Sequence, residues 1–209
     1  GKNLAGTFHQ PRFVCVDTRL LDTLSERDFR SGLAEVAKCA LLSVAFWRRL
    51  PRLVEGLGSR DPHPLAEAIA SSLRLKASIV ARDPDEALGL RHVLNLGHTV
   101  AHALEGASGY RLRHGEAVAW GLLAALRLST ARGLLPEPFS NAAAATLRGL
   151  LAPPPLSPGV RRTFPRFLPH DKKRDRAGLR DVLLDAPGRP RLVRVAEEEL
   201  AASLPSGDG

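Results

Sequence analysis

The spacing of apolar residues predicts a mainly helical chain. Apolar positions recur at the period of an α-helix in five long segments, at 31–50, 61–82, 90–105, 114–128 and 135–151. A helix start at residues 24–27 precedes the first of them. We expect Pro51 to end the first helix and the Asp-Pro-Asp sequence at 83–85 to end the second, because proline cannot continue a helix.

Short β elements are predicted at the two ends of the chain. Residues 13–17 alternate and are rich in β-formers, which indicates a short N-terminal strand. Residues 180–184 and 191–195 flank Ala-Pro-Gly at 186–188, which favours a C-terminal β-hairpin. A short helix at 197–204 should follow. The chain has no Gly-rich strand–turn–helix unit, so we expect no dinucleotide-binding half within it.

The predicted helix at 90–105 has an unusual polar face. At about 100° per residue, four polar residues lie within an arc of roughly 60°: Arg91, Asn95, His98 and His102. The opposite side carries residues that suit burial: Val93, Leu96, Val100, Ala103 and Leu104. A solvated helix face normally carries Glu and Lys. The groups found here are those that bind metals and anions.

A metal site is one reading of these histidines. Catalytic zinc usually takes three protein ligands from His and carboxylate groups. His98 and His114 could converge if the loop between them folds back, and Glu35 could supply the carboxylate. His102, one turn beyond His98, could line the same cavity. The spacing matches neither HExxH nor paired cysteines, so surface or capping histidines remain the alternative.

Two lysines also have alternative interpretations. Lys38 lies three residues after Glu35, and could form an ordinary ion pair or point into a cavity beside that carboxylate. Lys76 could be a lysine that covers an apolar helix face, or a ligand-binding group.

Two further groups of polar residues lie in a charge run and at the start of the chain. Lys172 and Lys173 could be a solvated loop or could close over a phosphate. Lys2 and Asn3 would ordinarily be part of a frayed terminus.

Composition and charge narrow the class of protein. A chain of 209 residues holds one domain, or one domain with a small appendage. The net charge of +8 raises the question of nucleic acid, but the arginines are scattered and aromatic residues are few. A solvated surface, or a basic pocket for a small anion, accounts for that charge. We therefore expect no nucleic-acid partner.

The same composition gives expectations about location and completeness. No apolar run approaches the length of a membrane span, no signal peptide is visible, and the two cysteines form no disulfide framework. These features predict a cytoplasmic protein without a membrane partner. The absence of methionine and the abrupt Gly-Lys-Asn opening indicate a piece of a longer polypeptide.

Read together, the motifs resemble the 3-dehydroquinate synthase family, from Gly1 to about Leu204. The matching segments come in the family's order, at 1–4, 8–11, 32–38, 89–105, 114–119 and 171–173. The resemblance implies an N-terminal NAD-binding α/β domain, missing from this chain, and a mainly helical C-terminal domain. Residues 1–24 would then be an interdomain segment, and residues 25–209 the helical metal- and substrate-binding domain.

The resemblance also implies a role for each candidate residue. Zn²⁺, or Co²⁺ in the same site, would be held by Glu35, His98 and His114. Substrate groups would be bound, or protons moved, by Lys38, Lys76, Arg91, Asn95 and His102, of which all but Lys76 would be catalytic. Lys2 and Asn3 would lie near the substrate ring and the nicotinamide, and Lys172 or Lys173 would contact phosphate.

The implied reaction belongs to the shikimate pathway. It is the NAD⁺- and zinc-dependent conversion of 3-deoxy-D-arabino-heptulosonate 7-phosphate, a phosphorylated sugar acid, into 3-dehydroquinate and phosphate. Without the NAD-binding domain, this chain alone should be inactive. The alternatives are a related sugar-phosphate cyclase, such as an amino-dehydroquinate synthase, or a catalytically silent truncated domain. Members of the family tend to be homodimers.

Overall fold

The computed structural model describes residues 9, 11–170, 174–175 and 178–205. Within these residues the helices are α1 (Glu26–Leu41), α2 (Val44–Trp47), α3 (Leu50–Gly58), α4 (Pro62–Arg82), α5 (His98–Ala107), α6 (His114–Ala131), α7 (Glu137–Leu151), α8 (Pro158–Thr163) and α9 (Glu197–Ser203). Three 3₁₀ helices accompany them, η1 (Thr18–Thr23), η2 (Leu90–Asn95) and η3 (Phe164–His170). The mainly helical fold predicted from the sequence is confirmed.

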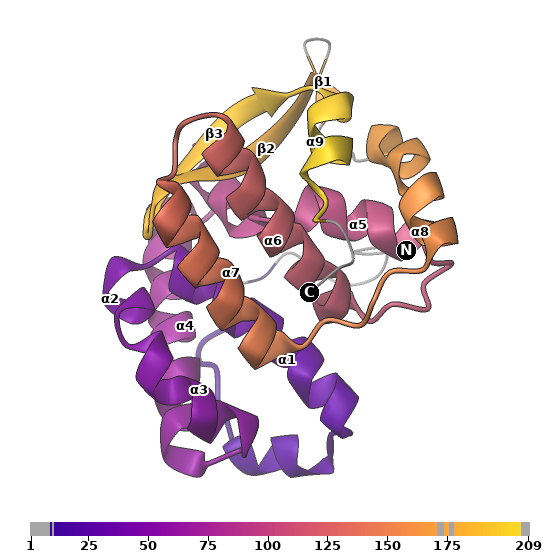
Figure 1. The fold of residues 1–209 in the computed structure, drawn as a ribbon. Helices are drawn as coiled ribbons and strands as arrows, with labels where there is room; N and C mark the ends of the chain where they lie inside the picture. The colour runs from indigo at the N-terminus through magenta and orange to yellow at the C-terminus, as the bar shows by residue number, and fades with distance from the viewer. Residues whose placement is uncertain (1–8, 10, 171–173, 176–177, 206–209) are drawn as a thin grey trace.

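Helix α6 is the centre of the core (Figure 1). Every residue from Ala117 to Leu126 is buried. Helices α1, α5, α7 and α9 pack around it, and strand β2 (Gly178–Ala186) lies against it as well. A helix that is apolar on all sides is stable only when neighbours cover it in this way. No helix in the described part of the chain is long and apolar enough to cross a membrane.

The predicted hairpin is also confirmed. Strand β2 pairs antiparallel with β3 (Arg189–Val195), and the two-residue strand β1 (Arg174–Asp175) adds to the other edge of β2. The hairpin is tied to the core by the backbone N–H of Leu184, which donates to Ser129 Oγ of α6 at 3.0 Å.

The predicted N-terminal strand is wrong. Residues 13–17 form no strand in the described structure. Phe13 is 81% exposed and Val14 is 70% exposed. An extended segment becomes a strand only when a neighbouring strand satisfies its backbone hydrogen bonds, and no strand in the described structure pairs with these residues.

The predicted helix start at residues 24–27 is confirmed, but the length of the first helix was predicted wrongly. Helix α1 begins at Glu26, after Ser25, whose side chain accepts a hydrogen bond from the Asp28 N–H. It ends at Leu41 and does not continue to residue 50, since α2 and α3 follow as separate helices. Pro51 does not end a helix but lies in the first turn of α3. Proline is favoured there because the first N–H groups of a helix have no partner within it.

The predicted helix at 90–105 is divided into η2 and α5. Gly97 separates them with φ of 76°, in the left-handed region that favours glycine. A Cβ added to Gly97 would lie 2.8 Å from the carbonyl carbon of Gly121 in α6. The break therefore allows α5 and α6 to approach closely, which an uninterrupted helix would not. We had predicted that Arg91 and Asn95 share a helix face with His98 and His102. This prediction is wrong, because the two pairs lie in different helices.

Candidate metal centre

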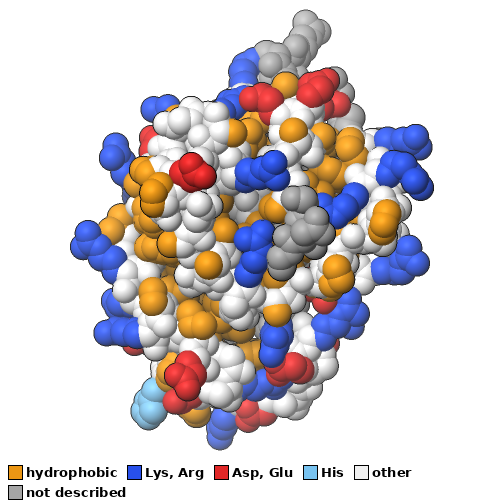
Figure 2. Space-filling model, viewed as in Figure 1, with side chains coloured by type: hydrophobic (Ala, Val, Ile, Leu, Met, Phe, Trp, Pro, Cys, Tyr) orange, Lys and Arg blue, Asp and Glu red, His pale blue; other side chains and the backbone are white. Residues whose placement is uncertain are grey.

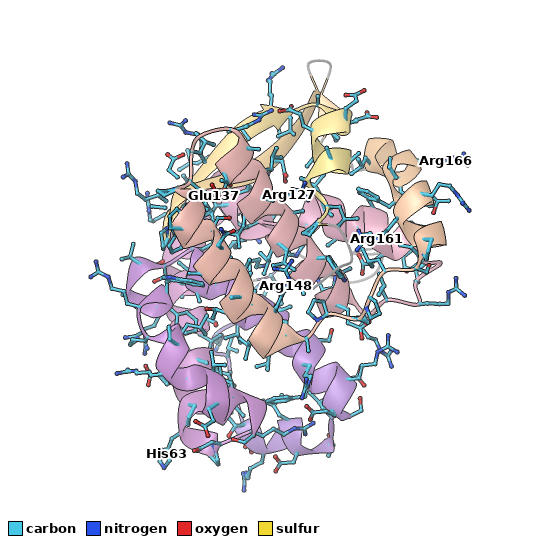
Figure 3. The ribbon with its side chains drawn as sticks, in the orientation of Figure 1. His63, Arg127, Glu137, Arg148, Arg161 and Arg166 are labelled. Carbon is cyan, nitrogen blue, oxygen red and sulfur yellow. The ribbon has the colours of Figure 1, made fainter. Side chains whose placement is uncertain are left out.

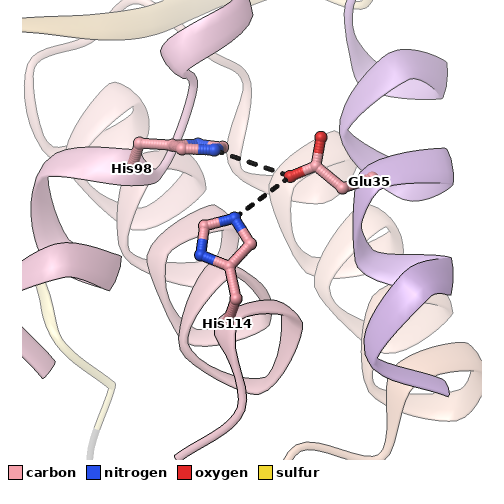
Figure 4. Close-up of side chains that lie close together, drawn as sticks. All are labelled: Glu35, His98 and His114. Atoms are coloured by element: carbon pink, nitrogen blue, oxygen red, sulfur yellow. Dashed lines mark ion pairs between the residues drawn. The ribbon is translucent and has the colours of Figure 1, made fainter. Parts of the chain in front are cut away.

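Three side chains from three helices converge beside α6 (Figure 4). Glu35 comes from α1, and His98 and His114 are the first residues of α5 and α6. Glu35 Oε1 lies 3.5 Å from His98 Nε2 and 3.7 Å from His114 Nε2, and one ligand atom from each residue lies within 4.8 Å of the others. Ligands of a tetrahedral zinc ion lie about 3.3 Å apart, so small side-chain movements would enclose a cation.

The convergence depends on a close contact between α1 and α6. Gly115 follows His114, and its N–H donates to Ser31 Oγ at 2.9 Å. A Cβ at Gly115 would overlap the backbone of Ser31. Ser31 lies one helical turn before Glu35, on the same side of α1. The contact that requires glycine at 115 thus brings the carboxylate of Glu35 to the ring of His114.

Both imidazoles are oriented through their second nitrogen. His98 Nδ1 lies 3.2 Å from the carbonyl oxygen of Leu96, and His114 Nδ1 lies 3.2 Å from Glu105 Oε1. When Nδ1 carries the proton and donates to these acceptors, each Nε2 presents a lone pair towards Glu35. Histidines that bind metals are usually held in this manner.

Sequence reasoning assigned no role to Glu105. A signal was nevertheless present, because His98, His102 and Glu105 follow one another at helical spacings of four and three residues and so share one side of α5.

Glu35 has the properties expected of a ligand. Burial raises the pKa of Glu35, but the neighbouring imidazole of His114 and the charge of Lys38 outweigh burial and hold this pKa below its ordinary value. Lys38 Nζ lies 2.7 Å from Glu35 Oε2, so the ion pair is present, and the lysine side chain is only 4% exposed. Oε1 of Glu35 is buried with no hydrogen-bond partner among the described residues. An ionised carboxylate with one unsatisfied oxygen facing two imidazoles suits a divalent cation.

The two imidazoles have opposite electrostatic environments. Burial, together with the charge of Lys38, lowers the pKa of His98 to about 4. Contacts with Glu105 and Glu35 raise the pKa of His114 to about 9. His98 is therefore neutral at pH 7, the form that binds a metal, whereas His114 would release a proton on binding one.

Two further candidate residues lie beside these three. The ring of His102 is exposed, and its centroid lies 5.6 Å from that of His98 and 6.3 Å from that of His114. Lys76 of α4 lines a pocket of about 200 Å³ together with Glu35. The structure thus brings an imidazole and a cation to the edge of the cluster, as a site for an anionic ligand requires.

The remaining candidates have contacts elsewhere or lie outside the described residues. Arg91 Nη1 lies 3.7 Å from Glu86 Oε2, and Asn95 Nδ2 donates to the carbonyl oxygen of His92 at 3.2 Å. Neither contact involves the three clustered side chains. The predicted roles of Arg91 and Asn95 stay predictions. Four candidates fall outside the described residues: Lys2, Asn3, Lys172 and Lys173.

The basic charge is spread over the surface. Lys and Arg side chains are scattered over the face shown in Figure 2. Arginines labelled in Figure 3 come from four different elements, with Arg127 on α6, Arg148 on α7, Arg161 on α8 and Arg166 on η3. This distribution matches the scattering along the sequence.

Comparison with known proteins gives a consistent result. Residues 32–174 match the family model described as 3-dehydroquinate synthase C-terminal. A curated 3-dehydroquinate synthase from Geotalea uraniireducens is 42% identical over 199 residues, which are 94% of this chain and 55% of that protein. One from Halorhodospira halophila is 45% identical over 192 residues, or 90% of this chain and 53% of that protein. The chain spans about half the length of the curated relatives it matches.

Solved structures of sugar-phosphate cyclases share the fold. A structure of 2-deoxy-scyllo-inosose synthase, complexed with carbaglucose-6-phosphate, NAD⁺ and Co²⁺, has a TM-score of 0.77 and 27% sequence identity, and the match covers 98% of this chain and 58% of that chain. A structure of 2-epi-5-epi-valiolone synthase from Streptomyces hygroscopicus, with NAD⁺ and Zn²⁺ bound, has a TM-score of 0.78 and 27% identity, covering 97% and 57%.

Proposed function

The chain belongs to the 3-dehydroquinate synthase family, and we propose that it is the metal- and substrate-binding part of such an enzyme. The reaction is the conversion of 3-deoxy-D-arabino-heptulosonate 7-phosphate into 3-dehydroquinate and phosphate, a carbon–oxygen lyase reaction. The support for 3-dehydroquinate synthase over other cyclases is the identity of 42–45% to curated 3-dehydroquinate synthases, against 27% to the two cyclase structures.

The observation that carries the proposal is the buried Oε1 of Glu35, which has no hydrogen-bond partner within the described part of the chain and faces the Nε2 atoms of two histidines. Glu35, His98 and His114 would hold Zn²⁺ or Co²⁺, both of which suit a site of nitrogen and oxygen ligands. When bound, the cation would supply Lewis acidity towards substrate oxygens, and NAD⁺ would supply reversible hydride transfer.

The remaining residues would bind the substrate and move protons. Lys76, in the pocket beside Glu35, would neutralise an anionic group of the substrate. His102, in ring contact with both histidine ligands, is placed to exchange a proton with the substrate or to contact phosphate. Lys38 would keep Glu35 ionised, and could reach the substrate only by leaving Oε2 of that carboxylate.

Arg91 and Asn95 would bind the carboxylate and hydroxyls of the substrate from η2. A guanidinium fork matches the geometry of a carboxylate. Because Arg91 lies 3.7 Å from Glu86, the substrate carboxylate would take over the place of Glu86. Lys2, Asn3 and one of Lys172 and Lys173 would complete the contacts with nicotinamide and phosphate.

The chain would need a second domain to act. Residues 1–24 would lead from an NAD-binding domain into the domain formed by residues 25–209. The match to the C-terminal family model, over about half the length of the relatives, supports this division. We expect no turnover from the chain alone, and turnover when the N-terminal half of a relative is joined to it.

Metal analysis of the purified chain tests the centre. We expect about one Zn²⁺ per chain, and its loss in His98→Ala and Glu35→Gln. His63→Ala is the matched control, because this exposed histidine lies on α4, at the end of the molecule far from α6 (Figure 3). A folded wild-type chain that takes up no Zn²⁺ or Co²⁺ would contradict the proposed centre.

A second experiment tests the substrate. The chain joined to the N-terminal half of a relative should act on 3-deoxy-D-arabino-heptulosonate 7-phosphate in preference to its amino-substituted analogue and to glucose 6-phosphate. Preference for the amino analogue would identify an amino-dehydroquinate synthase instead. Bound zinc without turnover of any of the three would favour a catalytically silent domain.

A further inference from the structure

We propose that Glu105 is the positioning residue that orients His114 at the metal centre. The inference rests on the proposed function, because it concerns the second nitrogen of a proposed ligand. Its basis is geometric. Glu105 Oε1 lies 3.2 Å from His114 Nδ1, and the carboxylate side chain is 16% exposed while the imidazole is 48% exposed.

The exposure of His114 explains why it requires such a partner. The His98 side chain is only 11% exposed, and its Nδ1 faces a backbone carbonyl that cannot move without moving the chain. His114 is half exposed and has no such enclosure, so its ring could rotate or carry the proton on either nitrogen. A hydrogen bond to Glu105 selects the tautomer with the proton on Nδ1 and turns Nε2 towards Glu35.

The position of Glu105 also connects two ligands. Glu105 lies on α5, the helix that begins with His98, while His114 begins α6. Glu105, on the helix that begins with His98, therefore sets the orientation of the His114 ring. Its negative charge strengthens the imidazole as a donor to a cation, an effect that a neutral acceptor provides only in part.

The competing explanation is a purely structural contact between the last turns of α5 and the start of α6. Glu116 provides the matched control for it. Glu116 also fixes the start of α6, through Arg27 and through the backbone N–H of Arg113 at 2.8 Å. No contact of Glu116 in the described structure involves an imidazole.

The test is the Zn²⁺ affinity of the whole chain, measured by competition with a chelator. We expect Glu105→Ala to bind Zn²⁺ about 10- to 100-fold more weakly than wild type, Glu105→Gln to be intermediate, and Glu116→Gln to match wild type. If Glu105→Ala does not fold, Glu105→Gln decides. If Glu105→Ala folds and binds Zn²⁺ as tightly as wild type, the proposal is overturned. If it does not fold, wild-type Zn²⁺ affinity in Glu105→Gln overturns the proposal instead.

A spectroscopic readout separates orientation from stability. In long-range ¹H–¹⁵N spectra of the metal-free chain, recorded at a pH at which the ring is neutral, His114 should carry its proton on Nδ1 in wild type and in Glu116→Gln. In Glu105→Ala the proton should move towards Nε2, which faces Glu35, and an unchanged ring would overturn the inference. Absence of Zn²⁺ from the wild-type chain would instead contradict the proposed function, so the two failures are distinguishable.

Discussion

The starts of α5 and α6 each supply one imidazole, but the two are held by different means. At the start of α5, His98 is only 11% exposed and is fixed by the carbonyl of Leu96, next to the left-handed turn at Gly97. At the start of α6, His114 is half exposed and is fixed by the carboxylate of Glu105. A buried ligand can be positioned by backbone geometry alone, whereas a ligand near solvent requires side chains.

The anchoring of the two helices shows the same contrast. Thr99, next to His98, donates to the buried carboxylate of Asp181 on β2 at 2.9 Å. Apart from the close contact of Gly115 with Ser31, the start of α6 is tied to α1 by the side chain of Arg27, whose guanidinium is 53% exposed and lies 2.7 Å from Glu116 Oε2. Replacing the side-chain anchor should therefore cost more at the start of α5 than at the start of α6.

The largest of these effects should come from the close contact between Gly97, at the start of α5, and Gly121 of α6. In Gly121→Ala, the new Cβ would overlap the carbonyl oxygen of Gly97, and overpacking against backbone is costly. We expect a loss of about 3 kcal/mol in the free energy of unfolding, measured by urea titration. Gly149→Ala on α7 is the control, since open space surrounds it, and should stabilise the chain by up to about 1 kcal/mol. A similar change in both variants would contradict the argument.

The next effect should come from the hydrogen bond between α5 and the sheet. Thr99→Val removes a donor from the buried Asp181, which should cost about 1–3 kcal/mol of unfolding free energy and weaken Zn²⁺ binding through the displaced His98. Thr146→Val is the control, because this partly exposed threonine donates to the Ala142 carbonyl within its own helix. If Thr99→Val proves as harmless as the control, the anchor does not position α5.

Titration of the metal-free chain should distinguish the two histidines by sign. The pKa of His98, lowered to about 4 by burial, means that stability is lost as pH falls from about 6.5 towards 4. The pKa of His114, raised to about 9 by its carboxylate partners, means that stability is fully present below about pH 6.5 and lost as pH rises towards 9.

Urea titrations from pH 4 to 9.5 measure both effects. The loss of stability that His98 causes should be at most about 3 kcal/mol, and the loss that His114 causes should be smaller, because its half-exposed ring is screened by solvent. His98→Gln should abolish only the acidic loss, and His114→Gln only the basic one. If one variant abolished both the acidic and the basic loss of stability, the assignment of the two losses to separate histidines would be wrong.

The smallest effect should come from the exposed ion pair at the start of α6. Arg27→Gln breaks the contact with Glu116, but exposed ion pairs contribute little to stability. We expect unfolding by urea and Zn²⁺ affinity to match wild type within error. A marked loss of Zn²⁺ affinity would mean that α6 depends on this pair as much as α5 depends on its buried anchor.

Local sequence signals were sufficient for part of the fold. Helix α4 was predicted from Asp61 and Pro62, and in the structure the Asp61 side chain caps it. The hairpin followed from its turn and flanking apolar residues. The break at Gly97 could not be seen, because helical periodicity does not report how closely α6 approaches. The strand at 13–17 failed for a related reason, since pairing depends on a partner outside the segment.

The candidate site shows a similar limit. From spacing alone, the metal hypothesis had no advantage over surface histidines, and only the ordered series of motifs identified Glu35, His98 and His114 together. Their convergence depends on contacts between distant segments, such as Gly115 with Ser31. Of the two acceptors of Nδ1, the carbonyl of Leu96 carries no sequence signal, whereas Glu105 left a signal in its helical spacing from His98 and His102 that the prediction did not use.

The origin of the three proposed ligands in three separate helices has a consequence for folding itself. A cation held by α1, α5 and α6 is a cross-link between distant parts of the chain, and it closes long loops that the unfolded chain leaves open. Since an unfolded chain cannot assemble the ligands, the apparent stability would rise with the logarithm of free metal concentration. A chelator would then act on this domain as a mild denaturant.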